Sequence, residues 1–256
     1  MAGSKKRNVL LLSATIKPPE GMPALVRVDP AQRLADYSGA LGFYSQLLSH
    51  CFDAIVFAEN SQWDLSSLRR QMAKDGMEDK VEFISFNGLN YPPSYGRGYG
   101  EFLLVDYAVA HSEFLRAFSE ASVWKCTGRY IVRNMAEIVR GRPDCDLYCH
   151  MRNYRYPLCE LFLLSWNLRA YEAVIHNVYH ALRNDVIPGV HTIEETLFRK
   201  IVDSKIQTIS VVPRFKVVPL IEGVRGWNNS RYSDRIWSPK IVIRRLTNLA
   251  APWLWI

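Results

Sequence analysis

Three apolar runs alternate with amphipathic segments in the first ninety residues, and this alternation restricts the fold more than any other feature of the sequence. NVLLLSATI (8–16), AIVFAEN (54–60) and VEFISF (81–86) predict buried strands. The segment 30–50 places its apolar residues on one helical face, and a second, shorter helix is predicted before the third strand. Successive βα units predict an α/β fold with a mainly parallel sheet, helices on both faces, and ligand-binding groups at the carboxyl ends of the strands.

Predicted strands and helices also alternate in the rest of the chain. A loop rich in Gly, Pro and Tyr (87–100) is predicted to lead into a helix that ends near Phe118, and the apolar run before KCTGR predicts a fourth strand. Further strands are predicted at 146–151, 160–166 and 206–212, and further helices at 167–184 and 192–203. Because no linker divides the chain earlier, we predict one domain over residues 1–213 and a C-terminal extension over 214–256.

Composition indicates a globular protein of the cytoplasm. Hydrophobic residues make up 48% of the chain and charged residues 22%, which is ordinary for a globular domain. No apolar run is long enough to span a bilayer, and the N-terminal residues lack the pattern of a secretory signal. Five cysteines in a chain of this size indicate thiols rather than a disulfide framework.

The net charge of +7 is concentrated at the C-terminus. Residues 214–256 contain eight basic and two acidic residues, so that this extension carries +6, and four tryptophans are interleaved with the charges. A nucleic-acid-binding protein usually spreads basic residues over a folded face, whereas this pattern is typical of binding to an anionic membrane surface. We therefore expect a membrane-surface partner and no nucleic acid.

The last segment, SPKIVIRRLTNLAAPWLWI (238–256), predicts an amphipathic helix. Its apolar residues fall on one face, its cations lie away from that face, and it ends in two tryptophans. It is too short and too charged to cross a bilayer, so it either lies in the interface or packs on the core. The interface interpretation predicts a peripheral protein on the inner face of the cytoplasmic membrane.

Polar residues and a glycine follow three of the predicted strands where they end: Thr15, Glu59, Asn60, Lys125, Thr127, Gly128 and Arg129. The acid and the amide after the second strand are suited to a ribose or a base. The cations, the hydroxyl and the glycine amide after the fourth strand are suited to phosphates. The alternative is that Glu59 and Asn60 cap a turn and Arg129 pairs with a surface acid. Their common position at one sheet edge favours a site for an anionic ligand.

The segment GRGYGE (96–101) resembles a dinucleotide-binding loop only in part. It lacks the third glycine at the required place and does not directly follow a strand, so we exclude a nicotinamide dinucleotide. Its glycines still allow backbone amides and Arg97 to approach a phosphate. The alternative is a flexible loop that closes onto the helix through Tyr99.

Several short motifs together resemble those of a family of bacterial polysaccharide-synthesis glycosyltransferases with a GT-A-like nucleotide-sugar domain. They are SATI (13–16), Arg33 with Tyr37, FAENS (57–61), GRGYGE (96–101), KCTGRYIVRN (125–134) and IEETL (193–197). The resemblance covers roughly residues 8–225, and its most specific motif is lysine-x-threonine-glycine-arginine-tyrosine. It implies transfer of a sugar from a nucleotide-diphosphate sugar to a glycan or lipid-linked acceptor in O-antigen or capsule synthesis.

Many such enzymes place a metal-binding pair of aspartates where this chain has Lys125 to Arg129. The resemblance therefore implies that Lys125 and Arg129 stabilise the leaving diphosphate without a cofactor, with Mn²⁺ or Mg²⁺ as the alternative. Asp144-Cys145-Asp146 fits the letters of an aspartate-x-aspartate motif but follows a proline, so we interpret it as a turn. Zinc binding by Cys145, Cys149, His150 and Cys159 fits no standard spacing.

HTIEETLF (191–198) contains the candidate catalytic base. Thr192 followed three residues later by Glu195 predicts a capping box, in which Glu195 reaches back to the helix N-terminus. Glu194 is then available to the cleft, and the resemblance places an acidic residue at this helix start. A carboxylate that deprotonates the acceptor hydroxyl makes the enzyme inverting. The alternative is a solvated acid favoured by the helix dipole. Glu160 and Glu195 are the candidates for acceptor contact.

Three functions compete at this point. The motif series favours a nucleotide-sugar-dependent glycosyltransferase. A non-catalytic sugar-nucleotide-binding subunit would carry the same binding motifs. A nucleic-acid-binding protein would suit the sequence pI of about 9.2 but not the confinement of the charge to residues 214–256.

Overall fold

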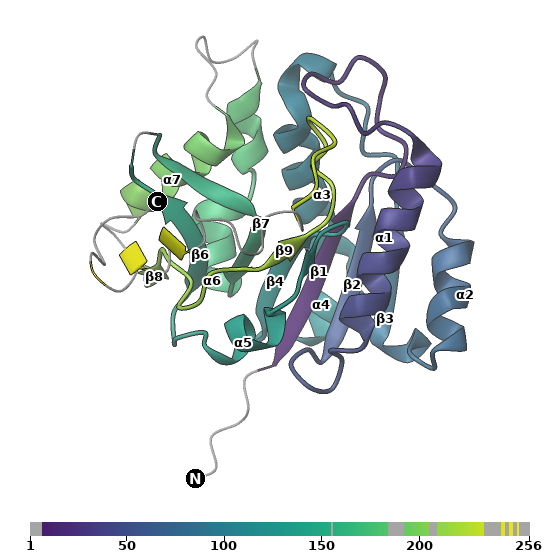
Figure 1. Ribbon diagram of the computed structural model, residues 1–256, viewed down its shortest axis with the longest axis horizontal. Helices are drawn as coiled ribbons and strands as arrows, with labels where there is room; N and C mark the ends of the chain where they lie inside the picture. Colours follow the sequence, from purple (N-terminus) through teal and green to yellow (C-terminus); the bar gives the residue numbers. More distant parts are fainter. Residues whose placement is uncertain are drawn as a thin grey trace.

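A seven-stranded sheet forms the middle of the molecule (Figure 1). The computed structural model describes residues 7–154, 156–183, 192–204 and 209–232, together with 242–243, 246–247 and 250. The strands lie in the order β3-β2-β1-β4-β7-β6-β8. They are β1 (Asn8–Ala14), β2 (Ala54–Glu59), β3 (Val81–Ser85), β4 (Ser122–Thr127), β6 (Leu147–Arg152), β7 (Leu158–Trp166) and β8 (Val211–Val212).

The sheet is mainly parallel, as the sequence predicts. β1 pairs in parallel with β2 and β4, and β2 with β3. β7 runs antiparallel to β4 and β6, and β6 pairs in parallel with β8. Because β1 lies between β2 and β4, the direction in which the sheet grows reverses between β3 and β4. Open α/β sheets bind their ligands at the carboxyl edge of such a reversal.

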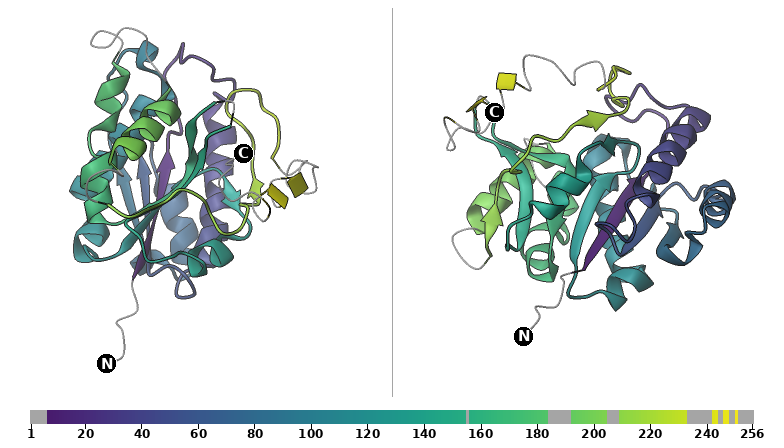
Figure 2. Two further views of the ribbon diagram at one scale, coloured as in Figure 1. Left: turned by 90° about the vertical axis from the view of Figure 1, so that its left-hand side faces the viewer. Right: turned by 60° about the horizontal axis from the view of Figure 1, so that its bottom comes forward.

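Helices cover both faces of the sheet, and this prediction is also confirmed (Figure 2). One face packs against α1, α2 and α5, and the other against α3, α4, α7 and the turns between residues 168 and 182. The helices are α1 (Pro30–Ser45), α2 (Ser66–Lys74), α3 (Gly96–His111), α4 (Glu113–Ala117), α5 (Met135–Arg140) and α7 (Ile193–Ser204).

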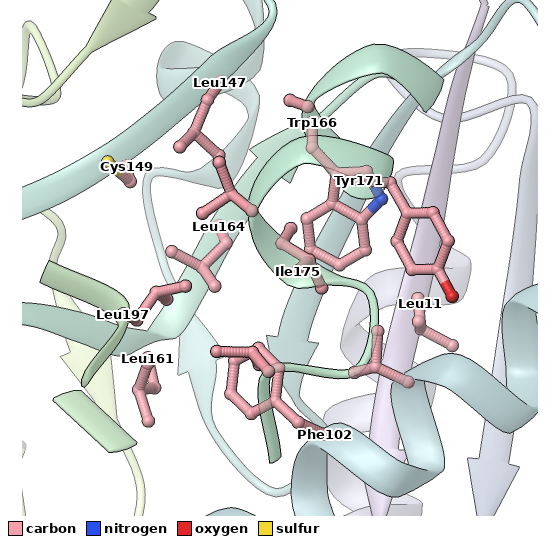
Figure 3. Packing of buried hydrophobic residues seen from close by; sticks show 14 of the residues in the cluster. Leu11, Phe102, Leu147, Cys149, Leu161, Leu164, Trp166, Tyr171, Ile175 and Leu197 are labelled. Carbon is pink, nitrogen blue, oxygen red and sulfur yellow. The ribbon is translucent and has the colours of Figure 1, made fainter. Parts of the chain in front are cut away.

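The central strands are mostly apolar because both of their faces are buried. In β1, Leu10 and Leu12 belong to the cluster beneath α1, whereas Leu11 belongs to the cluster beneath α3. Figure 3 shows this second cluster, in which Leu11, Phe102 and Tyr171 come from three distant segments. Alternate residues of β1 therefore contribute to two separate cores. Burying one large apolar side chain stabilises the fold by about 1.5–3 kcal/mol.

The predicted loop over 87–100 ends earlier than expected, because residues 96–100 already form the first turn of α3. α3 begins at Gly96, whose φ of 80° is the left-handed conformation that glycine adopts easily. A Cβ atom at Gly98 would collide with Ile193 of α7, and one at Gly100 would collide with the hydroxyl of Tyr91. These two glycines therefore permit close packing around a helix rather than flexibility of a loop.

The predicted helix over 167–184 is broken into three short pieces. They are α6 (Leu168–Ala170), a π-helical turn (Tyr171–Ile175) and a 3₁₀ turn (Val178–Leu182). Asn177 separates the last two with φ of 59°, a left-handed conformation that ends a right-handed helix. The apolar periodicity in this region reflects burial against the sheet, which α-helical, π-helical and 3₁₀ turns all provide here.

Residues 209–232 return across the molecule. Phe215 packs in the cluster beneath α1, and β9 (Ile221–Glu222) pairs antiparallel with β5 (Ile131–Val132). The domain boundary near residue 213 stays a prediction. Apart from 242–243, 246–247 and 250, the predicted amphipathic tail lies outside the described residues. Of the helices that the structure describes, none has the length and hydropathy needed to cross a membrane.

Candidate functional site

A cleft of about 530 Å³ opens at the carboxyl edge of the sheet, where β1 and β4 end. Its walls come from the ends of these strands, the first turns of α3 and α7, the start of β7 and the segment 223–232. The position agrees with the topological reversal between β3 and β4. Seven of the predicted site residues line the cleft: Thr15, Arg33, Arg97, Thr127, Arg129, Glu160 and Glu194.

A tight turn over residues 127–130 follows β4 at the cleft and leads into β5. Thr127 is the register neighbour of Ser13 in β1, and the N–H of Tyr130 donates to the Thr127 carbonyl at 2.9 Å. The N–H of Gly128 donates to the Ser13 carbonyl at 2.9 Å, and a Cβ at Gly128 would lie 2.8 Å from that oxygen. Glycine is needed here for close approach of the backbone, and its amide is engaged within the sheet rather than presented to a ligand.

Lys125 does not reach the cleft, although the sequence places it at the end of a strand. Its side chain is fully buried and faces α3. The ammonium group forms an ion pair with Glu101, donates to the Leu161 carbonyl at 2.6 Å and lies 3.4 Å from the Thr127 hydroxyl. An ammonium group has three protons, and these three acceptors account for all of them. Direct contact of Lys125 with a phosphate therefore has no support in the geometry.

Glu101 is a cleft residue that was not among the residues predicted from the sequence. It lies one turn after Arg97 in α3, and its side chain is 23% exposed in the wall of the cleft. Ser13 and Thr127 donate hydroxyl hydrogen bonds to it at 3.2 Å, in addition to the ion pair with Lys125. Burial alone would raise the pKa of this carboxyl, but Lys125 and the hydrogen bonds outweigh burial and hold the pKa below its ordinary value.

Two arginines bring positive charge to the cleft. Arg97 is exposed on the first turn of α3, and no described residue accepts a hydrogen bond from its guanidinium group. Arg129 is 8% exposed and donates to the Val224 carbonyl and, at 2.9 Å, to the Tyr130 hydroxyl. Both guanidinium groups lie beside Gly226, since a Cβ there would be 2.9 Å from Arg129 Nη2 and 3.6 Å from Arg97 Nη1.

The segment that contains Gly226 completes this wall. The Val26 and Arg27 N–H groups donate to the Gly226 carbonyl at 2.8 and 3.1 Å. Trp227, one of the four tryptophans of the C-terminal extension, lines the cleft and is 53% exposed. Part of the C-terminal extension therefore belongs to the candidate site.

Glu59 does not line the cleft. The carboxylate is fully buried and accepts the N–H groups of Ile16 and Ser61 at 2.9 Å and of Trp63 at 3.0 Å. Three backbone donors on one carboxylate fix the loops that follow β1 and β2. The structure thus places Glu59 as a support of the strand ends rather than beside the cleft.

Asn60, Thr15 and Arg33 form a second support. Asn60 accepts the Thr15 hydroxyl at 2.6 Å and donates to the Gly100 carbonyl at 3.1 Å, which ties β1 to α3. Arg33 donates from Nε to the Thr15 carbonyl at 2.7 Å and from Nη2 to the Tyr37 hydroxyl at 3.1 Å. Thr15 and Arg33 line the cleft, whereas Asn60 is buried beneath it.

Glu194 lies in the cleft at the first turn of α7. Burial raises the pKa of this carboxyl, the negative charge of Glu101 raises it further, and a hydrogen bond from Thr192 and the charge of Arg97 offset part of the change. The Thr192 hydroxyl accepts the N–H of Glu195 at 3.3 Å, which is one half of the predicted capping box. Glu195 itself is not among the residues that line the cleft.

Glu160 lines the cleft from β7 and forms an ion pair with Arg152 of β6. Both side chains are partly exposed, Glu160 by 23% and Arg152 by 30%. The pair lies at the same sheet edge as the ends of β1 and β4, since β6 is antiparallel to β7 and β7 to β4.

Asp146, Cys145 and Cys149, which were considered as metal ligands, do not line the cleft. Asp146 accepts the N–H of Ser210 at 2.7 Å and the Asn167 side chain at 2.7 Å, at the amino end of β6 and away from the cleft. Cys145 packs on the α1 side and Cys149 on the α3 side, so these two thiols lie on opposite faces of the sheet. Within the described ranges, no three His, Cys, Asp or Glu residues are grouped as metal ligands.

No protein-family profile matches the sequence, and no curated protein is similar to it at a significant level. Among solved structures, a protein assigned as a nucleotide-diphospho-sugar transferase from Desulfovibrio desulfuricans G20 is 11% identical, with a TM-score of 0.45 over 81% of this chain and 79% of that one. An active-site mutant of LgtC is 11% identical, with a TM-score of 0.46 over 76% and 69%. The glycosyltransferase GlyE of Streptococcus pneumoniae TIGR4 is 11% identical, with a TM-score of 0.47 over 82% and 45%. Similarity at this level carries no functional argument, so an activity has to be inferred from the cleft residues.

Proposed function

We propose that this protein is a glycosyltransferase that uses a nucleotide-diphosphate sugar as its donor. One observation carries the proposal. The cleft at the topological reversal of the sheet combines two guanidinium groups, Arg97 and Arg129, with two carboxylates whose pKa values are shifted in opposite directions, Glu101 and Glu194. Guanidinium groups suit a diphosphate, and carboxylates with separated pKa values suit sugar binding and proton transfer.

The two arginines supply the charge that the leaving group needs. As the glycosidic bond breaks, negative charge develops on the nucleoside diphosphate, and fixed cations in a partly buried cleft stabilise it. In this proposal Arg97 and Arg129 stabilise the leaving diphosphate, a role for which the sequence had suggested Lys125 and Arg129. We propose a metal-independent reaction, with assistance by Mn²⁺ or Mg²⁺ as the outcome to be tested.

Glu194 is the proposed general base of an inverting reaction. A base must be ionised to accept the proton of the acceptor hydroxyl, and a raised pKa makes the carboxylate a stronger base at neutral pH. Direct attack of the acceptor oxygen on the anomeric carbon forms the new glycosidic bond, breaks the bond to the diphosphate and transfers the proton to Glu194. The proton then passes from Glu194 to solvent.

A thermal-shift screen tests the donor assignment. The protein is heated with each of the common nucleoside diphosphates and their hexose conjugates, with and without Mn²⁺ and with EDTA. A ligand that binds only the native state raises the midpoint of unfolding. We expect at least one nucleoside diphosphate to raise it in EDTA. If none does so under any condition, the proposed function is wrong, and a response that requires Mn²⁺ would replace the metal-independent version.

Arg97→Ala and Arg129→Ala should each weaken nucleoside-diphosphate binding by about ten- to a hundredfold, the range expected for one hydrogen bond to a charged group. Isothermal titration of the full chain measures the affinity. Arg97 makes no hydrogen bond to the described residues, so its substitution should leave the free energy of unfolding unchanged. Arg70→Ala, on exposed α2 surface, is the matched control and should bind as the wild type does. Unchanged affinity in both cleft variants would contradict the assignment.

We further propose that the acceptor is a glycan or lipid-linked intermediate of bacterial surface polysaccharide synthesis, and that the protein works at the inner face of the cytoplasmic membrane. The support is the charge of +6 in residues 214–256 and the amphipathic pattern of 238–256. Each cation near an anionic surface contributes about 1 kcal/mol of binding, so the three of this segment, Lys240, Arg244 and Arg245, suffice for reversible attachment.

A chain truncated after Trp237 should stay folded and keep its affinity for the nucleoside diphosphate, but it should no longer sediment with anionic liposomes at low salt. The full chain should sediment with them, and less so as salt is raised. Neutral liposomes are the control. Unfolding of the truncated chain would instead indicate that residues 238–256 pack on the core.

A further inference from the structure

The two carboxylate oxygens of Glu101 have different surroundings. All three protein donors, namely the Ser13 hydroxyl, the Thr127 hydroxyl and the Lys125 ammonium, meet at Oε1. No described residue donates a hydrogen bond to Oε2. Glu101 lines the cleft and keeps 23% of its side-chain surface exposed. One oxygen is therefore anchored by three donors, and the other is left to a ligand.

The chemistry of Oε2 restricts what that ligand presents. An ionised carboxylate only accepts hydrogen bonds, so it attracts hydroxyl or N–H groups and repels the oxygens of a phosphate. A bare cation would also bind it, but among the described residues no group of three His, Cys, Asp or Glu side chains is placed to hold one. The ligand atoms beside Oε2 are therefore expected to be hydrogen-bond donors, such as hydroxyl groups.

The helix sets the spacing between this carboxylate and the phosphate site. Arg97 and Glu101 are four residues apart in α3 and lie on one face, separated by about one helical turn, or roughly 5–6 Å. In a nucleotide-diphosphate sugar, the ring is attached directly to the distal phosphate. A diphosphate held by Arg97 would thus place hydroxyl groups of the sugar within reach of Glu101.

We propose that Oε2 of Glu101 binds hydroxyl groups of the transferred sugar, and that Lys125 is the positioning residue that fixes this carboxylate. The proposal rests on the proposed function, since it takes the diphosphate to lie at Arg97 and Arg129. Because Oε1 is held by three donors, Oε2 has little freedom to follow a displaced hydroxyl. Glu101 is then a residue that selects the donor sugar by the arrangement of its hydroxyl groups.

The test compares the affinity for a nucleoside diphosphate with that for its sugar conjugate. The probes are the nucleoside diphosphate that gives the largest thermal shift, its hexose conjugates, and the monodeoxy forms of the best conjugate. In the wild type, the sugar should add to the affinity, and removal of one particular hydroxyl should cost about ten- to a hundredfold. Glu101→Gln should abolish the contribution of the sugar, leave the affinity for the nucleoside diphosphate within about twofold, and be insensitive to the same deoxy change.

Two controls keep the result interpretable. Glu137→Gln, an exposed acid on α5 at the opposite face of the sheet, should bind every probe as the wild type does. Glu101→Asp keeps the charge beside Lys125 but withdraws the carboxylate from the cleft, so it should also lose the contribution of the sugar. If Glu101→Gln does not fold, Glu101→Asp and the deoxy series on the wild type still decide the outcome.

Other outcomes would overturn the proposal in distinguishable ways. The nucleoside diphosphate could bind normally while no sugar adds to the affinity, or the sugar contribution could survive in both Glu101 variants. Either result would rule out the contact between Glu101 and the sugar but would leave the proposed function standing. Loss of a Mn²⁺-dependent thermal shift in Glu101→Gln, with the sugar contribution intact, would make Glu101 a cation ligand instead. Failure of all nucleoside diphosphates to bind the wild type would overturn the proposed function and the sugar contact together.

Discussion

Glu194→Gln is expected to lower the rate of sugar transfer by about 10²- to 10⁴-fold while the affinity for the donor stays unchanged. Glutamine keeps the shape of the side chain and its place at the start of α7, but it cannot accept the proton of the acceptor hydroxyl. Transfer of a radiolabelled sugar measures the rate, and titration with the donor measures affinity. In the wild type, the rate should rise as the pH passes upward through the pKa of Glu194, which lies above the ordinary value of 4.5.

The same substitution has a distinctive effect on stability. A carboxyl whose folded-state pKa is raised binds its proton more tightly in the native state, so the native state loses stability as the pH rises through that pKa. Glutamine resembles the protonated form, and Glu194→Gln should therefore be at least as stable as the wild type at pH 7. A solvated helix-cap acid would behave oppositely, because its ionised form stabilises the helix N-terminus by about 0.3–1 kcal/mol.

Glu195→Gln is the matched control on the same helical turn. It should retain sugar transfer and lower the free energy of unfolding by about 0.3–1 kcal/mol, because glutamine also suits this position of a capping box and only the favourable charge at the helix N-terminus is lost. Equal transfer rates for wild type and Glu194→Gln would eliminate Glu194 as the base. The absence of transfer with every donor and acceptor, despite normal donor binding, would favour a non-catalytic sugar-nucleotide-binding subunit.

The arrangement of the sheet could be predicted because its signals are local. The apolar runs at residues 8–16, 54–60 and 81–86 are long enough to indicate strands by themselves, and βα succession then dictates parallel pairing. The pairing of β5 with β9 could not be predicted in this way. Each has two residues, and they come together only because residues 214–222 return across the sheet.

The cleft was predictable as a position but not as a set of contacts. Strand ends indicate which residues lie near the carboxyl edge, whereas the face to which each side chain turns depends on packing against distant helices. Glu59 turns away from the cleft because it accepts three backbone N–H groups, and Lys125 is buried because it forms an ion pair with Glu101. Glu101 itself stood at the end of a segment predicted to be a loop, and only the helical conformation from Gly96 onward brings it beside β4.

Lys125→Met should lower the free energy of unfolding by about 3 kcal/mol, at the low end of the 3–5 kcal/mol that removal of one partner from a buried ion pair costs. Methionine fills nearly the same volume, so the loss reflects charge rather than packing. The low end applies because Glu101 keeps 23% of its side-chain surface exposed and is partly solvated. Urea titration at pH 7 measures the difference. Arg133→Met, in the exposed Arg133–Glu222 pair, should cost less than about 1 kcal/mol.

The pH dependence of this loss identifies its cause. In the wild type, Lys125 and the two hydroxyls hold the pKa of Glu101 below 4.5, so their stabilisation is present above about pH 4.5 and is lost as the pH falls through the lowered pKa. Without Lys125, burial should raise the pKa of Glu101 instead, and the variant should gain stability relative to the wild type as the pH is lowered from 7. The two stabilities should therefore converge in acid.

The double variant Lys125→Met with Glu101→Gln separates the ion pair from other roles of the lysine. Neutralising Glu101 removes the unpaired carboxylate, so the double variant should be more stable than Lys125→Met alone at pH 7, and the two substitutions should be strongly non-additive. Its affinity for the nucleoside diphosphate should remain, since Arg97 and Arg129 are untouched. Additive losses at all pH values would show that Lys125 stabilises the fold through the Leu161 carbonyl and its packing, and that Glu101 does not depend on it.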